Sequence, residues 1–174
     1  MTVVLPADLV FRTWRSSDVE ALVKYANNKS IWMNLRDSFP HPYTEADAED
    51  WIGMNHVLVG PPVNFAIEVG GEAIGGVGLE LLDDVLEDTA NVGCWVAQPF
   101  WGRGIATAAL EFITDYAFTN LPLERLQVGV FGWNQAAGRV LEKAGYLFEG
   151  CLRRAIVKDG RVGDLRFFGR IRST

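Results

Sequence analysis

Residues 91–110 join a short apolar strand to an alanine-rich helix through a loop that contains Gly102 and Gly104. Glycine lets the backbone turn tightly and approach a ligand closely. The first turn of a helix presents unpaired N–H groups and the positive end of the helix dipole. The segment therefore predicts a site for phosphate oxygens at residues 102–107. On the glycines alone, an ordinary strand-to-helix turn is an equal alternative.

Two well-known phosphate loops are excluded by the spacing in this segment. The dinucleotide fingerprint needs a third glycine at a fixed position, and the nucleoside triphosphate loop needs Gly-Lys followed by Ser or Thr. Neither pattern occurs in residues 91–110. The segment therefore indicates a pyrophosphate site of a different kind.

Composition limits the class of protein to which this segment can belong. The 174 residues fit one domain, 1–174, and the 49% hydrophobic and 22% charged fractions are those of a globular protein. The net charge of −6 argues against nucleic acid as a partner and suits a cationic, amine-bearing substrate. No apolar run reaches about 18 residues, and no secretory signal is visible, so no membrane association is expected.

The two cysteines, Cys94 and Cys151, lie in apolar, strand-like runs. This placement predicts buried free thiols rather than a disulfide framework. No neighbouring His or Cys has the spacing of zinc ligands, so no metal site is expected. A reducing, cytoplasmic compartment follows as an expectation.

Hydrophobic periodicity predicts a mixed α/β sheet built as one unit. Ser16, Ser17 and Asp18 offer N-caps for the first helix. The aromatic-rich segment 31–43, interrupted by Pro40 and Pro42, is predicted to be an irregular connector. In chain order, the expected elements are a strand at 9–14, helices at 19–27 and from 45 to about 59, strands at 63–69, 72–82 and 90–97, a helix at 104–119, a strand at 125–131, a helix at 135–144, and late strands at 146–152, 155–157 and 165–171.

The decapeptide Trp-Gly-Arg-Gly-Ile-Ala-Thr-Ala-Ala-Leu at 101–110 resembles the pyrophosphate-binding motif of GNAT superfamily acetyltransferases, Gln/Arg-x-x-Gly-x-Gly/Ala. Gly104 takes the fourth place and Ala106 the sixth. Trp101, in the first place, is similar to the aromatic-Gly-Lys/Arg-Gly form of the branch that acetylates ribosomal-protein N-termini. Downstream, residues 134–146 resemble that branch's Asn-x-x-Ser-x-x-Val-Leu-Glu-Lys-x-Gly-Phe segment. With both motifs in the right order, the likeness covers most of the chain.

The resemblance implies a GNAT-like acyl-CoA N-acyltransferase fold of the mixed α/β class. Its central twisted sheet is mostly antiparallel, with helices on both faces and a V-shaped splay between two parallel strands, 91–97 and 125–131. The implied cofactor is acetyl-CoA, whose pantetheine arm pairs with backbone in the splay as an added strand. The cofactor-binding residues implied by the motifs are Trp95, Val96, Gly102, Arg103, Gly104, Ile105, Ala106, Thr107, Asn134 and Arg139.

The implied reaction is N-acetyl transfer to a primary amine by direct attack in a ternary complex, with a backbone N–H near Val96 meeting the oxyanion. The chain departs from the family at Leu141, Ala137 and Asn91, none of which can serve as the acid or base found there in relatives. Glu80 is the expected substitute base, because strand alternation places it on one face with Gly76 and Gly78. An exposed strand-end carboxylate is an equal alternative for Glu80. Asn134 completes the expected catalytic pair by bonding the pantetheine arm.

The acceptor is expected to be a small-molecule amine or a protein or peptide N-terminus. Its predicted contacts are Trp32, Arg36, Phe39, His41 and Tyr43. The acidic loop at 83–88 would attract a positively charged amine and disfavour anionic acceptors. A monomer or a homodimer fits the sequence equally well. Because three family positions are changed, a non-catalytic acyl-CoA-binding module or sensor remains the alternative function.

Overall fold

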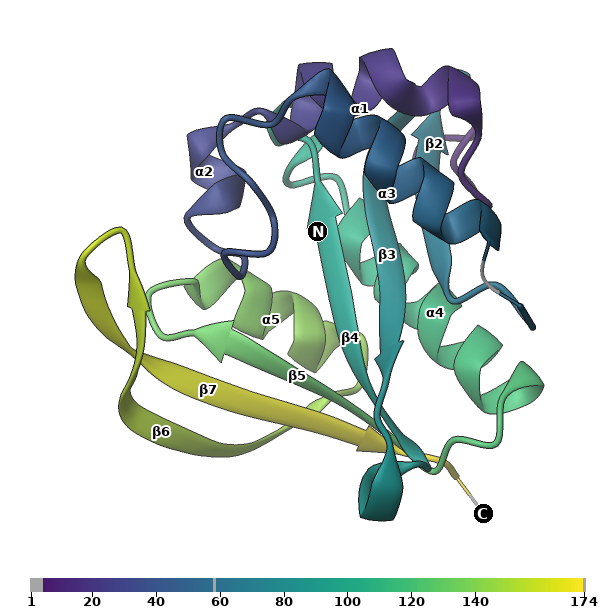
Figure 1. Cartoon of the computed structure of the whole chain (residues 1–174). Coiled ribbons are helices and arrows are strands. Elements are labelled where there is room, and N and C mark those ends of the chain that lie inside the picture. Colours follow the sequence, from purple (N-terminus) through teal and green to yellow (C-terminus); the bar gives the residue numbers. More distant parts are fainter. Residues whose placement is uncertain (1–4, 58, 174) are drawn as a thin grey trace.

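The computed structural model describes residues 5–57 and 59–173, and at its centre lies a seven-stranded sheet (Figure 1). The strand order is β1-β2-β3-β4-β5-β7-β6. Only β4 and β5 pair in parallel, so the sheet is mostly antiparallel, as predicted. The strands are β1 (Val10–Arg12), β2 (Asn64–Val69), β3 (Glu72–Leu81), β4 (Thr89–Val96), β5 (Arg125–Phe131), β6 (Leu147–Lys158) and β7 (Arg161–Ile171).

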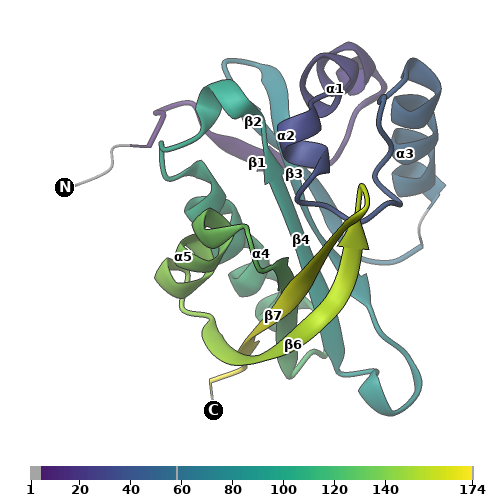
Figure 2. The ribbon, with the colours of Figure 1, turned by 90° about the vertical axis from the view of Figure 1, so that its left-hand side faces the viewer.

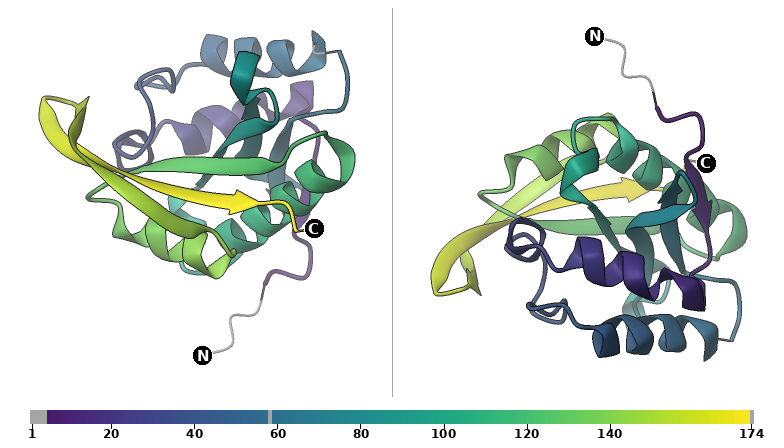
Figure 3. Two further views of the ribbon diagram at one scale, coloured as in Figure 1. Left: turned by 90° about the horizontal axis from the view of Figure 1, so that it is seen from below. Right: turned by 90° about the horizontal axis from the view of Figure 1, so that it is seen from above.

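Helices cover both faces of the sheet, which confirms the predicted layering (Figure 3). One face carries α1 (Val19–Ala26), α2 (Lys29–Trp32) and α3 (Glu45–Val57). The other carries α4 (Ile105–Asn120) and α5 (Gln135–Lys143). Three short 3-10 turns, η1 (Ser16–Asp18), η2 (Asp84–Leu86) and η3 (Gln98–Phe100), complete the described elements.

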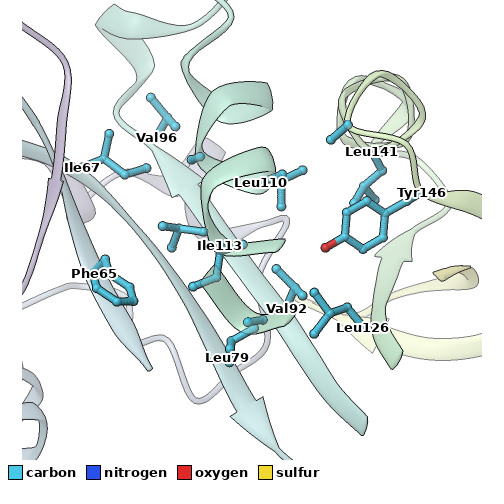
Figure 4. Close-up of a cluster of buried hydrophobic side chains, with 14 of the residues drawn as sticks. Phe65, Ile67, Leu79, Val92, Val96, Leu110, Ile113, Leu126, Leu141 and Tyr146 are labelled. Carbon is cyan, nitrogen blue, oxygen red and sulfur yellow. The ribbon is translucent and has the colours of Figure 1, made fainter. Parts of the chain in front are cut away.

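The main core lies between the sheet and α4. Figure 4 shows Leu110 and Ile113 of α4 meeting side chains from the strands, with Leu141 and Tyr146 closing the cluster beside α5. Ile113 and Leu126 are completely buried. A second cluster, built around Trp14, Leu22, Tyr43 and Ile52, fixes α1 and α3 to the opposite face. The first cluster thus lies under the parallel strand pair, and the second covers β2 and β3 on the other face.

The splay between the parallel strands is visible in the pairing of β4 with β5. Only three residue pairs join them, ending at Asn91 and Gln127. Beyond that point β4 remains paired with β3 as far as Val96, and β5 remains paired with β7 as far as Phe131. The two strands therefore diverge over the rest of their length, as the V-shaped splay requires.

Four local expectations need correction. The segment Ser16–Asp18 is a 3-10 turn, and Asp18 does not cap α1, because its carboxylate accepts from the Arg15 N–H at 2.8 Å and pairs with Arg12. The connector at 31–43 overlaps a short helix, α2. The loop at 83–88 contains the 3-10 turn η2. The three late strands are two long ones, since β6 continues through a bulge between Leu152 and Ile156.

The cysteine expectation holds only in part. Both thiols are free, but Cys151 is exposed on β6, the edge strand of the sheet. Cys94 on β4 is partly buried, and burial raises the pKa of its thiol to about 12. Within residues 5–57 and 59–173, no cluster of His, Cys, Asp or Glu could hold a metal ion. Among the same residues, no helix is long and apolar enough to cross a membrane.

A buried ion pair fastens β1 to the start of α1 and supplies a stability prediction. Arg12 donates twice to Asp18, at 2.7 and 2.8 Å, and also contacts Glu68. Burial would raise the pKa of the Asp18 carboxyl, but hydrogen bonds from Arg12 and the Arg15 N–H hold it below its ordinary value of 3.8. The charged form is therefore the one that stabilises the fold.

We expect Asp18→Asn to lower the free energy of unfolding by about 1–3 kcal/mol at pH 7, because a buried charge loses part of its pairing. A depressed folded-state pKa gives stability that is present above the ordinary Asp pKa of 3.8 and lost as pH falls through the lower folded-state pKa. The difference between wild type and variant should therefore shrink as pH falls below 3.8 in urea unfolding. Asp50→Asn, on the exposed side of α3, is the control, and an equal loss there would contradict the prediction.

Candidate functional site

The loop that precedes α4 has the backbone form expected of an anion site. Gly102 and Gly104 both adopt φ of 77°, in the left-handed region that favours glycine. The first intrahelical bond of α4 runs from the Ala108 N–H to the Gly104 carbonyl. The N–H groups of Ile105, Ala106 and Thr107 therefore precede any acceptor within the helix, and Gly104 offers no side-chain cap. Together these groups form the cradle, residues 102–107.

Trp101 ties the cradle to the end of β4. Its indole N–H donates to the Val96 carbonyl at 2.6 Å, while 48% of the side chain remains exposed. Arg103 folds back along the same loop, where it donates to the Pro99 carbonyl at 3.1 Å and lies over the Phe100 ring. The loop is therefore fixed mainly by its own side chains, which leaves the backbone N–H groups free for a ligand.

The backbone of β4 presents hydrogen-bonding groups to the splay in an alternating pattern. The Ala97 N–H donates to the Ile74 carbonyl of β3 at 2.7 Å. Ladder alternation then turns the Val96 N–H to the opposite edge of β4, where β5 has already diverged. The backbone of Trp95, by the same alternation, faces β3. Of the two residues expected to pair with the pantetheine arm, Val96 has the suitable orientation.

The end of β5 and the start of α5 form the other side of the splay. Asn134 caps α5, accepting from the Ala137 N–H at 3.2 Å. Leu141 is buried in the core and Arg139 is exposed on the outer side of α5. The Tyr146 hydroxyl lies deeper, 2.8 Å from the Thr114 hydroxyl, and burial raises its pKa. Helix α5 itself contains no Ser, Thr or Tyr that could donate a proton in place of Leu141.

A chain of polar side chains crosses the point where β4 and β5 part. Gln127 donates to the Asn91 carbonyl oxygen at 3.0 Å, and Asn91 in turn donates to Glu80 at 3.0 Å. Arg36 donates to the same Glu80 carboxylate at 2.9 Å. Hydrogen bonds from Asn91 and Arg36 lower the pKa of Glu80 from its ordinary 4.5. Glu80 is therefore held as an ionised, oriented carboxylate.

Four of the five expected acceptor residues are aromatic, and they form two pairs. Phe39 packs against Tyr43 and against Trp95 of β4, with ring centroids 5.2 and 5.8 Å away. Trp32 stacks on His41 at 5.4 Å. Tyr43 is buried in the cluster that also contains Ala66 of β2 and Ala73 of β3, while Arg36 reaches Glu80 as described above.

Lys158, to which the sequence assigned no role, joins the β6–β7 hairpin to Trp32 and Asp37. It is 2% exposed, its ammonium lies 3.8 Å from the Trp32 ring centroid, and it donates to Asp37 at 2.7 Å. Lys29 pairs with Asp159 at 3.2 Å. The tip of the β6–β7 hairpin is thus fastened to α2 and the segment after it, as Figure 2 shows. Partners 121 residues apart leave no local signal in the sequence.

Comparison with known proteins identifies relatives over most of the chain. The family described as acetyltransferase (GNAT) domain matches residues 8–147. A Bacillus subtilis protein named as a ribosomal N-acetyltransferase, YdaF, is 31% identical over 151 residues, which cover 86% of this chain and 81% of that protein. Spermidine N(1)-acetyltransferase of Vibrio cholerae is 24% identical over 161 residues, covering 92% and 91% of the two chains.

Solved structures share the fold. RimL, a ribosomal L7/L12 alpha-N-protein acetyltransferase in complex with coenzyme A, superposes with a TM-score of 0.83 at 21% identity and covers 97% of each chain. Spermidine N-acetyltransferase from Vibrio cholerae, in complex with CoA and spermine, gives a TM-score of 0.78 at 23% identity and covers 95% of this chain and 96% of that one.

These findings agree with the glycine cradle at the start of α4 and with the diverging β4 and β5. The family match covers both motifs from which the resemblance was inferred. The cofactor of this fold is acetyl-CoA, and its members are acyltransferases that acetylate amines. The chain belongs to the GNAT acetyltransferase family.

Proposed function

We propose that this protein carries out N-acetyl transfer within the splay between β4 and β5, with the cradle at residues 102–107 as the pyrophosphate site. Acetyl-CoA supplies the activated acetyl thioester. The observation that carries the proposal is that α4 begins with unpaired N–H groups and that the edge of β4 facing β5 is unpaired at Val96. We further propose one domain spanning residues 1–174, a cytoplasmic location, and a monomer or homodimer.

The residues around the splay fit the cofactor. The N–H groups of residues 105–107 would receive the pyrophosphate, because they precede any acceptor in α4 and carry the positive end of its dipole. A Cβ at Gly93 would meet nothing within 4 Å, so the face of β4 is open at this residue. Val96 would hydrogen-bond the pantetheine arm from the β4 side of the splay and Asn134 from the β5 side. Arg139 would contact the nucleotide.

The chain's own groups then divide the work of the reaction. The Val96 N–H is oriented to donate to a developing oxyanion, a form of stabilisation that preorganised N–H groups provide well. Glu80, kept ionised by Asn91 and Arg36, is the carboxylate proposed to accept the proton of the acceptor amine, directly or through water. Leu141 cannot protonate the leaving thiolate, which leaves that step to water.

The acceptor side is the surface bounded by α2, the segment after it, and the β6–β7 hairpin tip. Its aromatic groups, Trp32 with His41 and Phe39 with Tyr43, would hold the acceptor near Glu80. Relatives named for ribosomal proteins and for spermidine show that this family acetylates both N-termini and small amines. A primary amine is the acceptor group common to both.

The cradle is tested by Gly104→Val. A β-branched side chain at a φ of 77° is strained and would cover the N–H groups of the first turn, so CoA affinity should fall by at least tenfold in calorimetric titration. Gly71→Val is the matched control, since Gly71 has a φ of 81° in the β2–β3 turn, away from the cradle. Unchanged CoA affinity in Gly104→Val, with the control also unchanged, would refute the cofactor assignment.

The base is tested by Glu80→Gln, which keeps the shape of the side chain and removes its charge. We expect kcat/KM for the acceptor to fall about a hundredfold while CoA affinity stays the same. Because the pKa of Glu80 is lowered from 4.5, its carboxylate stays ionised from pH 6 to 9. We therefore expect the rate to rise over that range because the acceptor amine loses its proton. The variant should therefore show the same rise at a lower level.

Glu87→Gln, in the exposed loop at 83–88, provides the control for loss of one negative charge. It should leave kcat/KM within twofold of wild type. Equal activity of Glu80→Gln and wild type would show that Glu80 takes no part in proton transfer.

A further inference from the structure

The charge of the chain is distributed unevenly along the sequence. Residues 147–174, which contain the β6–β7 hairpin, carry seven Lys or Arg and three Asp or Glu. Residues 1–146 carry nine Lys or Arg and nineteen Asp or Glu. The hairpin region is therefore at +4 in a chain whose remainder is at −10. A local reversal of sign on this scale is typical of a surface that binds an oppositely charged partner.

Three arginines of the hairpin are free to contact such a partner. Arg153, Arg154 and Arg161 are exposed, and within residues 5–57 and 59–173 none pairs with a carboxylate. Arg153 and Arg154 lie in the bulge of β6, where the Arg154 N–H donates to Asp164 at 2.8 Å. The Arg161 guanidinium lies 4.3 Å from the Trp133 ring centroid. We call these three residues the arginine strip.

The strip begins beside the acceptor residues. Arg161 pairs in register with Lys158, the residue that contacts Trp32 and Asp37. Trp133, beneath Arg161, directly precedes Asn134 at the start of α5. From the hairpin tip the strip continues along β6 for five residues, which is about 17 Å of extended chain.

The acidic residues lie at the other end of the sheet. The loop at 83–88 connects β3 to β4 at the end where β4 and β5 are still paired (Figure 1). The hairpin tip lies toward the open end, near α2. The expectation that this acidic loop attracts a cationic acceptor therefore does not fit its position. The charge that faces an approaching acceptor is that of the hairpin.

We propose that the acceptor is the N-terminal segment of an acidic polypeptide, whose amine enters the splay while carboxylates a few residues downstream contact the arginine strip. This inference rests on the proposed acetyl transfer and names its substrate class. A polyamine would meet repulsion from Arg153, Arg154 and Arg161, and the Asp164 carboxylate of the same hairpin already accepts the Arg154 N–H at 2.8 Å. A single amino acid is too short to span from Glu80 to the bulge of β6.

The test uses three hexapeptides with free amino ends that differ only at positions 3–5, which are all Glu, all Gln or all Lys. Wild-type kcat/KM should be greatest for the Glu peptide and least for the Lys peptide. Arg153→Gln/Arg154→Gln should lower the Glu-to-Gln ratio of kcat/KM about fivefold, as the loss of two exposed charge contacts implies. The preference should also weaken with added salt.

Arg15→Gln/Lys24→Gln is the matched control, because it removes two positive charges from η1 and α1 and should leave the ratio unchanged. Binding of fluorophore-labelled Glu peptide to the protein with CoA, followed by anisotropy, gives a readout that does not need turnover. Weaker peptide binding in Arg153→Gln/Arg154→Gln, but not in the control variant, would support the arginine strip even if the peptide were not acetylated. Absence of acetylation would refute the proposed function and leave the binding result standing.

Three results would overturn the proposal. One is equal kcat/KM and equal binding for the Glu and Lys peptides. Another is a higher kcat/KM for spermidine than for the Glu peptide. The third is a loss of CoA affinity, rather than peptide affinity, in Arg153→Gln/Arg154→Gln, which would assign the arginines to the cofactor.

Discussion

The proposed acetyl transfer depends on a parallel strand pairing that stops early. If β4 and β5 remained paired beyond Asn91 and Gln127, the Val96 N–H would be occupied by β5. Because the strands part, one edge of β4 keeps free backbone groups inside an otherwise well-packed sheet. The cost of leaving that edge open is limited by α4, which packs Leu110 and Ile113 beneath the diverging strands. The same helix begins at the cradle, so one element both supports the splay and provides its anion site.

In the proposed mechanism, side chains at the closed end of the splay supply the carboxylate that Asn91 lacks. Asn91 cannot accept a proton, yet it orients Glu80 while being oriented itself by Gln127. The proposed base thus lies on β3, beside Asn91 of β4. The hydrogen bonds that orient Glu80 also lower its pKa, which favours the ionised carboxylate and suits it to contact an ammonium group.

Features set by local sequence could be predicted, and those set by distant contacts could not. The backbone form of the cradle depends on Gly102, Gly104 and the helix that follows, all within one short segment, so the sequence predicts this geometry. Its binding of pyrophosphate stays a prediction. Both specific motifs also identified the fold. The role of Asp18 was missed because its carboxylate binds Arg12, which the distant Glu68 also contacts, and so does not cap α1. Lys158 was missed for the same reason, since burial of an ammonium depends on Trp32 and Asp37.

The hairpin shows why overall charge is a poor guide to an acceptor. A net charge of −6 favours cationic ligands only if the acidic residues face the site, and electrostatic contacts at exposed positions decay within about 10 Å at moderate salt. Here the ion pairs Lys158–Asp37 and Lys29–Asp159 neutralise two carboxylates at the hairpin tip. Within residues 5–57 and 59–173, Arg153, Arg154 and Arg161 have no such partner. The contacts that fasten the hairpin to α2 thus place these arginines where the proposed substrate would approach.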